Sequence, residues 1–156
     1  MSHATLKQRR RSDYPYLLTY PTRWNDNDQY LHMNNAVYNS LFDTVTTTYA
    51  MEHCSFDPLK APLMCFLIDL EWKFLAPVSF PDTLDLGLRV KKLGKSSVVY
   101  EAAIFVLGND SPAAVGRRSY VYVDRESRKS SPMMEETRKG LKNLYRPLEV
   151  SPSTKL

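Results

Sequence analysis

The residues best suited to chemistry lie in one polar segment, residues 25–38. This segment holds two carboxylates, a histidine and two asparagines: Asp26, Asp28, His32, Asn34 and Asn35. Backbone N–H groups at a helix N-terminus carry partial positive charge, so they could hold a carbonyl oxygen and the oxyanion that develops on it. A carboxylate a few residues upstream could attack that carbonyl or activate a water. An Asp- and Asn-rich loop that only caps a helix is an equally open interpretation.

A long helix is predicted to begin where this segment ends. Apolar residues recur at every fourth position and mark one face of a helix over about Asn35–His53: Val37, Leu41, Val45 and Tyr49. Asn34 and Asn35 are good capping residues for its N-terminus. Because Thr46, Thr47 and Thr48 are poor helix formers, the helix is expected to depend on packing against a large neighbouring element.

Most of the remaining sequence has the pattern of β-strands. A first strand is expected at 14–24, and alternating apolar residues predict strands near 66–75, 84–90, 97–107 and 113–124. A short helix should follow Ser131-Pro132. Successive strands with short turns imply an antiparallel sheet, and the long helix can cover its apolar face. The residues expected to be buried between them are Val37, Leu41, Val45, Phe66, Ile68 and Leu70. The pattern therefore predicts an α+β fold in one domain, residues 13–147.

Composition and charge argue against several other classes of protein. No apolar run approaches the ~20 residues that a membrane span needs. The net charge of +4 comes from residues 1–12, which are expected to form a basic disordered tail, with a second disordered tail at 148–156. Nothing between the tails resembles a nucleic-acid-binding module. Two cysteines and three histidines predict neither a disulfide framework nor a metal site, so no metal or cofactor is expected.

The polar segment resembles the signature of hotdog-fold thioesterases related to 4-hydroxybenzoyl-CoA thioesterase, roughly Asp-x-Asp-x-x-(Gly/x)-His-Val-Asn-Asn-x-x-Tyr. Here it runs from Asp26 to Tyr38 as Asp-Asn-Asp-Gln-Tyr-Leu-His-Met-Asn-Asn-Ala-Val-Tyr. The similarity continues in 71–78, 82–84 and 92–97, and it covers about residues 14–125 in the right order. One departure is Leu31, which stands where many relatives have glycine before the histidine.

The resemblance implies a hotdog fold, in which a five-stranded antiparallel sheet wraps around one long central helix, with a short C-terminal helix. It also implies hydrolysis of an acyl-CoA thioester to the free acid and CoA. Asp28 would be the nucleophile or general base, and the backbone N–H of Asn35 would polarise the carbonyl. His32 would orient substrate or water, or only hold the loop, as is expected of Asp26. The implied substrate-binding residues are Asn34 and Tyr38, together with Lys92, Lys95 and Ser96 at the CoA phosphates. Solvated surface lysines are the alternative for the last group.

Other functions of the same fold stay open. These are an acyl-carrier-protein thioesterase, a non-catalytic protein that binds an acyl thioester, and an enoyl-thioester hydratase. The hydratase branch has its His five positions after the Asp, whereas His32 follows Asp28 by four. Hotdog relatives pair their exposed sheet edges, so a homodimer or homotetramer is expected. A cytoplasmic location is the default, since the Arg-rich start and the Ser-Thr-Lys-Leu end are weak mitochondrial and peroxisomal hints.

Overall fold

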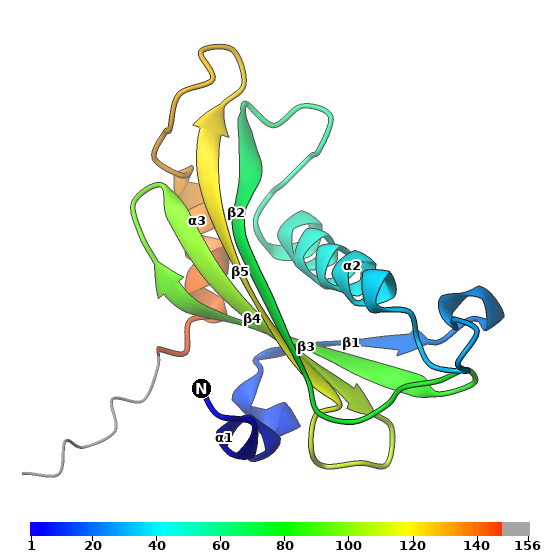
Figure 1. The fold of residues 1–156 in the computed structure, drawn as a ribbon. Coiled ribbons are helices and arrows are strands. Elements are labelled where there is room, and N and C mark those ends of the chain that lie inside the picture. The colour runs from blue at the N-terminus through cyan, green and yellow to red at the C-terminus, as the bar shows by residue number, and fades with distance from the viewer. Residues whose placement is uncertain (148–156) are drawn as a thin grey trace, which may run out of the picture.

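A curved five-stranded antiparallel sheet forms the body of the molecule (Figure 1). The computed structural model describes residues 1–147, so the tail expected at 148–156 lies outside the described residues. The strand order is β1-β3-β4-β5-β2, with bounds β1 (Tyr16–Pro21), β2 (Leu63–Phe74), β3 (Thr83–Leu93), β4 (Ser97–Val106) and β5 (Ala114–Asp124). Because β2 pairs with β5 and β1 pairs with β3, these two strands are the edges of the sheet.

The long helix α2 (Asn35–His53) lies against the concave face of the sheet (Figure 1). One face of it buries Tyr38, Leu41, Phe42, Val45 and Tyr49. These side chains belong to one core cluster with alternate residues of β3 and β4, among them Leu84, Leu86, Leu88 and Ile104. The predicted bounds of the helix and the burial of Leu41 and Val45 are confirmed, whereas Val37 is only partly buried against the same core. The three threonines at 46–48 are therefore held in a helix by tertiary packing, which outweighs their low propensity.

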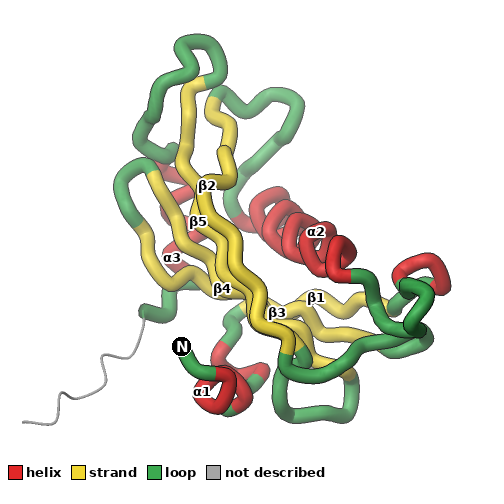
Figure 2. Tube along the Cα trace, in the orientation of Figure 1, coloured by secondary structure: helices red, strands yellow, loops and turns green. Residues whose placement is uncertain are grey.

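The short C-terminal helix is also confirmed as α3 (Glu135–Asn143), which packs beside the last turn of α2. The Tyr49 hydroxyl donates a hydrogen bond to the Gly140 carbonyl at 2.7 Å. A Cβ atom on Gly140 would lie 2.3 Å from the His53 carbonyl oxygen, so only glycine permits this close approach of the two helices. The tube in Figure 2 shows the curved sheet with the helices placed around it.

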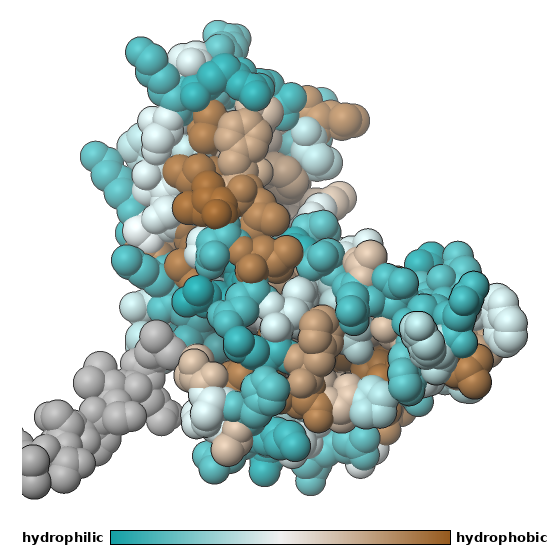
Figure 3. Space-filling view, in the orientation of Figure 1, coloured by the Kyte–Doolittle hydropathy of each residue, from teal (hydrophilic) through white to brown (hydrophobic). Residues whose placement is uncertain are grey.

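The expected burial of strand β2 is wrong. The exposed fractions of Phe66, Ile68 and Leu70 are 37%, 64% and 38%. Helix α2 lies over β3 and leaves the β2 edge uncovered, and a register shift between Leu67 and Asp69 interrupts the alternation. Figure 3 shows hydrophobic residues gathered over the upper part of β2. Strand β2 therefore presents an apolar, unpaired sheet edge.

The expected disorder of residues 1–12 is also wrong. Helix α1 (His3–Lys7) packs on the face of the sheet opposite to α2, where Leu6 is buried with Phe105 and Val115. Two of the basic residues behind it form ion pairs with acids of the sheet: Arg9 with Glu101 at 3.5 Å, and Arg11 with Asp85 at 2.8 Å. The positive charge that suggested a solvated tail instead neutralises carboxylates on the outer face.

Candidate active site

Asp26 anchors the polar loop between β1 and α2. Its side chain is only 1% exposed. The carboxylate accepts hydrogen bonds from the Arg23 backbone N–H at 2.7 Å, from the Arg23 guanidinium at 2.9 and 3.2 Å, and from the Tyr20 hydroxyl at 3.0 Å. Burial alone would raise the pKa of Asp26, but these donors outweigh burial and hold the pKa below its usual value. The Asp26 carbonyl also accepts from the Asn34 N–H at 2.8 Å, which ties the start of the loop to its end.

Asp28 lies at the open side of the same loop and is half-buried. Its Oδ1 accepts hydrogen bonds from the backbone N–H groups of Tyr30 at 2.8 Å and His32 at 3.4 Å. The Asp28 N–H donates to the His32 carbonyl at 2.8 Å, which closes a tight turn over residues 28–32. Within residues 1–147 no donor contacts Oδ2 of Asp28. The turn therefore fixes one carboxylate oxygen and leaves the other available for chemistry.

The tight turn requires a left-handed residue, and that residue is Leu31, with φ of 62°. Side chains with a Cβ rarely adopt this conformation, whereas glycine does so freely. The Leu31 carbonyl accepts a hydrogen bond from the Ser79 hydroxyl at 2.8 Å, and the nearby Met33 N–H donates to the Val78 carbonyl at 2.7 Å. The loop at 78–82 thus holds the turn in place, and the large Leu31 side chain points to solvent, 71% exposed.

The N-terminus of α2 offers a free backbone donor beside this turn. Asn34 is the N-cap, and its side chain accepts from the Ala36 N–H at 2.9 Å. Its carbonyl accepts from the Val37 N–H at 2.9 Å. Asn35 is an exposed residue, and its backbone N–H forms no hydrogen bond with any described residue. An oxygen placed here would receive that hydrogen bond and the partial positive charge of the helix end.

Tyr38 and His32 occupy different surroundings. Tyr38 is buried one turn into α2, with edge-on contacts to Trp72 and Phe74 at centroid distances of 5.6 and 4.9 Å. Burial raises the pKa of Tyr38 to about 12, so its hydroxyl stays protonated. His32 is exposed at the rim of the turn, and its ring has no hydrogen-bond partner within residues 1–147. His32 can contact a ligand at this end of α2. Tyr38 is instead packed among aromatic side chains between α2 and β2.

The turn with Lys92, Lys95 and Ser96 lies far from this loop in the same chain. Strand β3 begins beside the loop, where the Thr22 N–H donates to the Asp82 carbonyl at 2.9 Å. The strand then runs roughly 30 Å to the turn at its other end. There the carbonyl of Lys95 accepts from the Met133 N–H, and that of Ser96 from the Tyr122 N–H. One chain thus gathers Asp28, His32, Asn34, Asn35 and Tyr38 but not the lysine turn.

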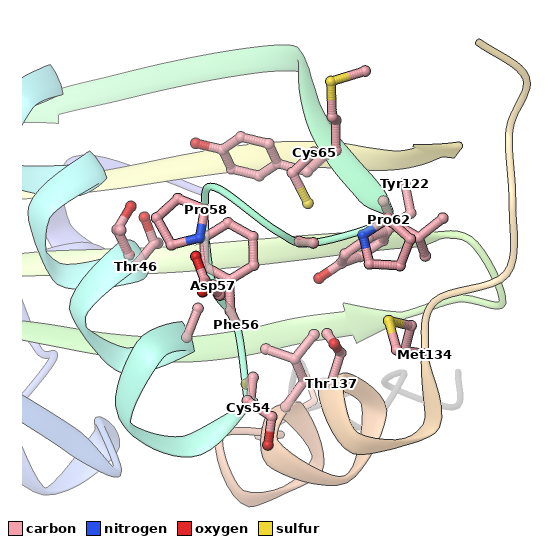
Figure 4. A pocket seen from close by; sticks show the side chains of 18 of the residues that line it. Thr46, Cys54, Phe56, Asp57, Pro58, Pro62, Cys65, Tyr122, Met134 and Thr137 are labelled. Carbon is pink, nitrogen blue, oxygen red and sulfur yellow. The ribbon is translucent and has the colours of Figure 1, made fainter. Parts of the chain in front are cut away.

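A cavity of about 510 Å³ opens at the other end of α2, where no motif predicted a site (Figure 4). Its walls come from α2, the loop at 54–62, β2, β4, β5 and α3. Among the lining residues are Ala50, Phe56, Leu63, Cys65, Tyr122 and Met134. Burial raises the thiol pKa of Cys54 to about 11, which makes it a weak nucleophile. The lining is assembled from six segments that are spread along the sequence, so no local pattern could have revealed it.

Architecture and loop geometry define a hotdog-fold protein with a carboxylate at the N-terminus of its central helix. A family model described as the thioesterase superfamily matches residues 30–113, more than half of the chain. The chain belongs to the thioesterase superfamily. The matched part includes Asn34, Asn35 and Tyr38 but begins two residues after Asp28.

Solved structures agree with this family. The PA5185 protein from Pseudomonas aeruginosa strain PAO1 is 37% identical, with a TM-score of 0.84 over 87% of this chain and 95% of that one. A thioesterase from Thermus thermophilus, complexed with coenzyme A and Zn, is 26% identical, with a TM-score of 0.71 over 85% and 95%. The SAV2348 protein from Staphylococcus aureus, in complex with CoA, is 16% identical with a TM-score of 0.77 over 88% and 89%, a likeness of fold alone. No curated protein sequence matches this chain significantly.

A membrane-spanning helix and a metal-binding cluster are both absent from the part of the chain that the structure describes. None of the helices within residues 1–147 is long and apolar enough to cross a membrane. Over the same residues, no group of three or more His, Cys, Asp or Glu side chains is arranged to hold a metal ion.

Proposed function

We propose that this chain hydrolyses an acyl-CoA thioester to the free acid and CoA. The observation that carries the proposal is that one hydrogen-bonded loop, tied together between Asp26 and Asn34, presents both an unoccupied carboxylate oxygen, Oδ2 of Asp28, and the free N–H of Asn35 at the N-terminus of α2. The thioester carbonyl accepts the Asn35 hydrogen bond, which polarises the C=O bond and stabilises the oxyanion. Asp28 then attacks the carbonyl carbon, or takes a proton from a water that attacks it.

The general-base route and the nucleophilic route each consume one water molecule. In the general-base route the water oxygen bonds to the carbonyl carbon, the C–S bond breaks, and the CoA thiolate takes up the proton held by Asp28. In the nucleophilic route Oδ2 of Asp28 bonds to the carbonyl carbon and the C–S bond breaks, which gives an acyl-aspartate anhydride and the CoA thiolate. Water then hydrolyses the anhydride, restores the Asp28 carboxylate and supplies the proton that the thiolate takes up. His32 orients the substrate or the water from the exposed rim. Asn34 holds the helix end, and Tyr38 forms the wall behind the acyl carbonyl.

We also propose that the working unit contains two chains paired through β2. An unpaired strand with exposed Phe66, Ile68 and Leu70 is a ready template for a second copy, which would bury these side chains. When β2 pairs antiparallel with β2 of a second copy, each strand of the partner's sheet runs in the opposite direction to its counterpart in the first chain. The end that carries Lys92, Lys95 and Ser96 in the partner then lies at the same end of the dimer as Asp28. This arrangement allows the partner's turn to contact the CoA phosphates while Asp28 acts on the thioester.

The competing functions have less support. A hydratase would need a His placed to deliver water to an alkene, whereas His32 is exposed at the rim and only four residues from Asp28. A non-catalytic binding protein gives no reason for a free carboxylate oxygen beside a free helix N-terminus. CoA is favoured over acyl carrier protein as the carrier because two proteins of this fold have been crystallised with it.

Cys54 and Cys65 are free thiols, which fits a reducing compartment such as the cytoplasm.

The test is a panel of thioesters offered to the purified protein, with release of free thiol as the readout. The panel includes saturated acyl-CoAs, an aryl-CoA, the matching acyl carrier protein thioesters and an enoyl-CoA. Thiol release from the CoA esters, faster than from the carrier-protein esters, is the expected result. Hydration of the enoyl-CoA without thiol release would replace the proposal with the hydratase alternative. Binding of acyl-CoA without turnover would replace it with the binding protein.

A further inference from the structure

Residues 3–14, the outer-face segment, cover the side of the sheet opposite to α2 (Figure 2). Side chains along β3 alternate between the two faces of the sheet. The leucines at 84, 86 and 88 belong to the core under α2. The residues that alternate with them all lie against the outer-face segment: Asp85, Gly87 and Arg89. The segment therefore follows the register of the strand beneath it.

Leu6 and Tyr14 are the apolar anchors of the outer-face segment. Their exposed fractions are 4% and 3%. They form a cluster, separate from the core under α2, with three residues of β4 and β5: Ala103, Phe105 and Val115. A Cβ atom on Gly87 would lie 2.7 Å from Cγ of Tyr14, so the tyrosine ring fits here because position 87 has no side chain. The two anchors bury apolar surface of the sheet that would otherwise face water.

Arg11 is the polar anchor between them. Its guanidinium pairs with Asp85 at 2.8 Å and donates to the Val106 carbonyl at 3.1 Å. The same group lies 4.9 Å from the centroid of the Phe105 ring. One side chain thus makes an ion pair, a hydrogen bond and a cation–π contact with β3 and β4. Loss of Arg11 should loosen the whole segment.

A buried ion pair lies beneath the outer-face segment. Arg89 and Glu101 face each other on β3 and β4, and they are 4% and 3% exposed. The Tyr14 hydroxyl donates to Glu101 at 3.0 Å, and Arg9 approaches the same carboxylate at 3.5 Å. Without the segment, the sheet would present a cation and an anion beside an apolar surface. Such a face is self-complementary, because a two-fold axis can set Arg89 of each copy against the partner's Glu101.

We propose that the outer face of the sheet is a self-association surface, and that the outer-face segment occupies it within each chain and so excludes a second copy. This role is separate from the proposed hydrolysis. With the proposed pairing through β2, it limits the assembly to two chains, because two dimers cannot stack sheet against sheet while the segment is in place.

The first experiment releases the segment in the full-length chain. Leu6→Asp combined with Arg11→Ala, the release variant, removes one apolar anchor and the polar anchor. Gln8→Asp combined with Arg10→Ala is the matched control, because it makes the same change in charge and also removes one trypsin site. Both control residues are exposed, and the Arg10 guanidinium donates only to carbonyls within the segment, at Lys7 and Arg9.

Two measurements are made on each variant. Trypsin cleavage within residues 7–11 should become at least ~tenfold faster in the release variant, because the lost burial of Leu6 alone shifts local opening by that much. The native mass, measured by light scattering after gel filtration, should be twice that of wild type. The control should keep the wild-type cleavage rate and mass. A release variant that is cleaved faster but keeps the wild-type mass would overturn the exclusion of a second copy. One that stays as resistant as wild type would overturn the anchoring.

A second pair of variants separates specific association from unfolding. Leu75 is partly buried against the cluster of Leu6 and Phe105. Leu75→Asp added to the release variant places a charge in the proposed interface, which disfavours its burial, so the mass should return to the wild-type value. A doubled mass that survives Leu75→Asp would place the association elsewhere and overturn the proposal. Arg11→Ala alone keeps Leu6 and serves if Leu6→Asp prevents folding. It should double its mass at higher protein concentration, and a wild-type mass at every concentration would contradict the proposed role.

Discussion

The polar loop between β1 and α2 holds two aspartates, Asp26 in its inner half and Asp28 in its outer half, and their surroundings differ sharply. Asp26, in the inner half, is buried and accepts hydrogen bonds on both carboxylate oxygens from Arg23 and Tyr20. Asp28, in the outer half, is half-buried and has one oxygen occupied by two backbone N–H groups. A carboxylate whose lone pairs are all engaged is a poor base, whereas one held by a single oxygen is both positioned and reactive. Within three residues of sequence, the donors around each oxygen separate a structural aspartate from a chemical one.

The largest effect should come from Asp28→Asn. The Asn side-chain carbonyl can still accept the hydrogen bonds from Tyr30 and His32, so the turn and the thermal midpoint should stay close to wild type. The substitution removes the charge that attacks or takes the proton, so kcat should fall by ~10²–10⁴. Thiol release and the thermal midpoint are measured on the same preparations. Near wild-type turnover in a well-folded variant would show that the outer carboxylate is not the reactive group.

Asp26→Asn should reverse the pattern, with a large loss of stability and a smaller loss of rate. The substitution weakens charge-assisted hydrogen bonds to a buried group, which predicts a drop of about 1–3 kcal/mol in the free energy of unfolding. Because the folded-state pKa of Asp26 is lowered, its contribution is present above the unfolded pKa and is lost as pH falls through the folded value. The stability gap between wild type and variant should therefore be full near neutral pH and shrink in acid below about pH 4. Urea unfolding at pH 7 and pH 3 checks both statements, and a gap that widens in acid would contradict them.

His32→Ala should produce an intermediate loss of rate. The His32 ring has no partner among the described residues, and only its backbone supports the Asp28 turn. Removing the ring should leave stability almost unchanged and lower kcat about tenfold, less than a positioned acid or base contributes. His32→Gln, which keeps a hydrogen-bonding side chain, is the companion variant and should recover part of the rate. Equal rates for wild type and His32→Ala would leave the histidine with no chemical role.

The predictability of these regions depends on how far apart the interacting residues are in the chain. The cap at Asn34, the loop around Asp28 and the helix stripe through Leu41 are set by near neighbours, so the sequence predicted them correctly. The exposure of Ile68 depends on where α2 crosses the sheet. Arg11 meets Asp85 across 74 residues, so residues 1–12 could only be judged a tail. The cavity and the distant Lys95 turn depend on tertiary assembly, which no local pattern records.

The smallest effect, and the one that tests backbone geometry alone, is expected for Leu31→Gly. Leu31 holds the left-handed conformation that closes the Asp28 turn, at a cost of about 1–2 kcal/mol for a residue with a Cβ. Glycine removes that cost but adds freedom to the unfolded chain, worth roughly 0.5–1 kcal/mol. The free energy of unfolding should therefore rise by up to about 1.5 kcal/mol. Leu31→Ala is the matched control, because it removes the exposed side chain and keeps the Cβ, so it should give no gain. If Leu31→Ala is as stable as Leu31→Gly, the effect lies in the exposed side chain and the turn carries no strain.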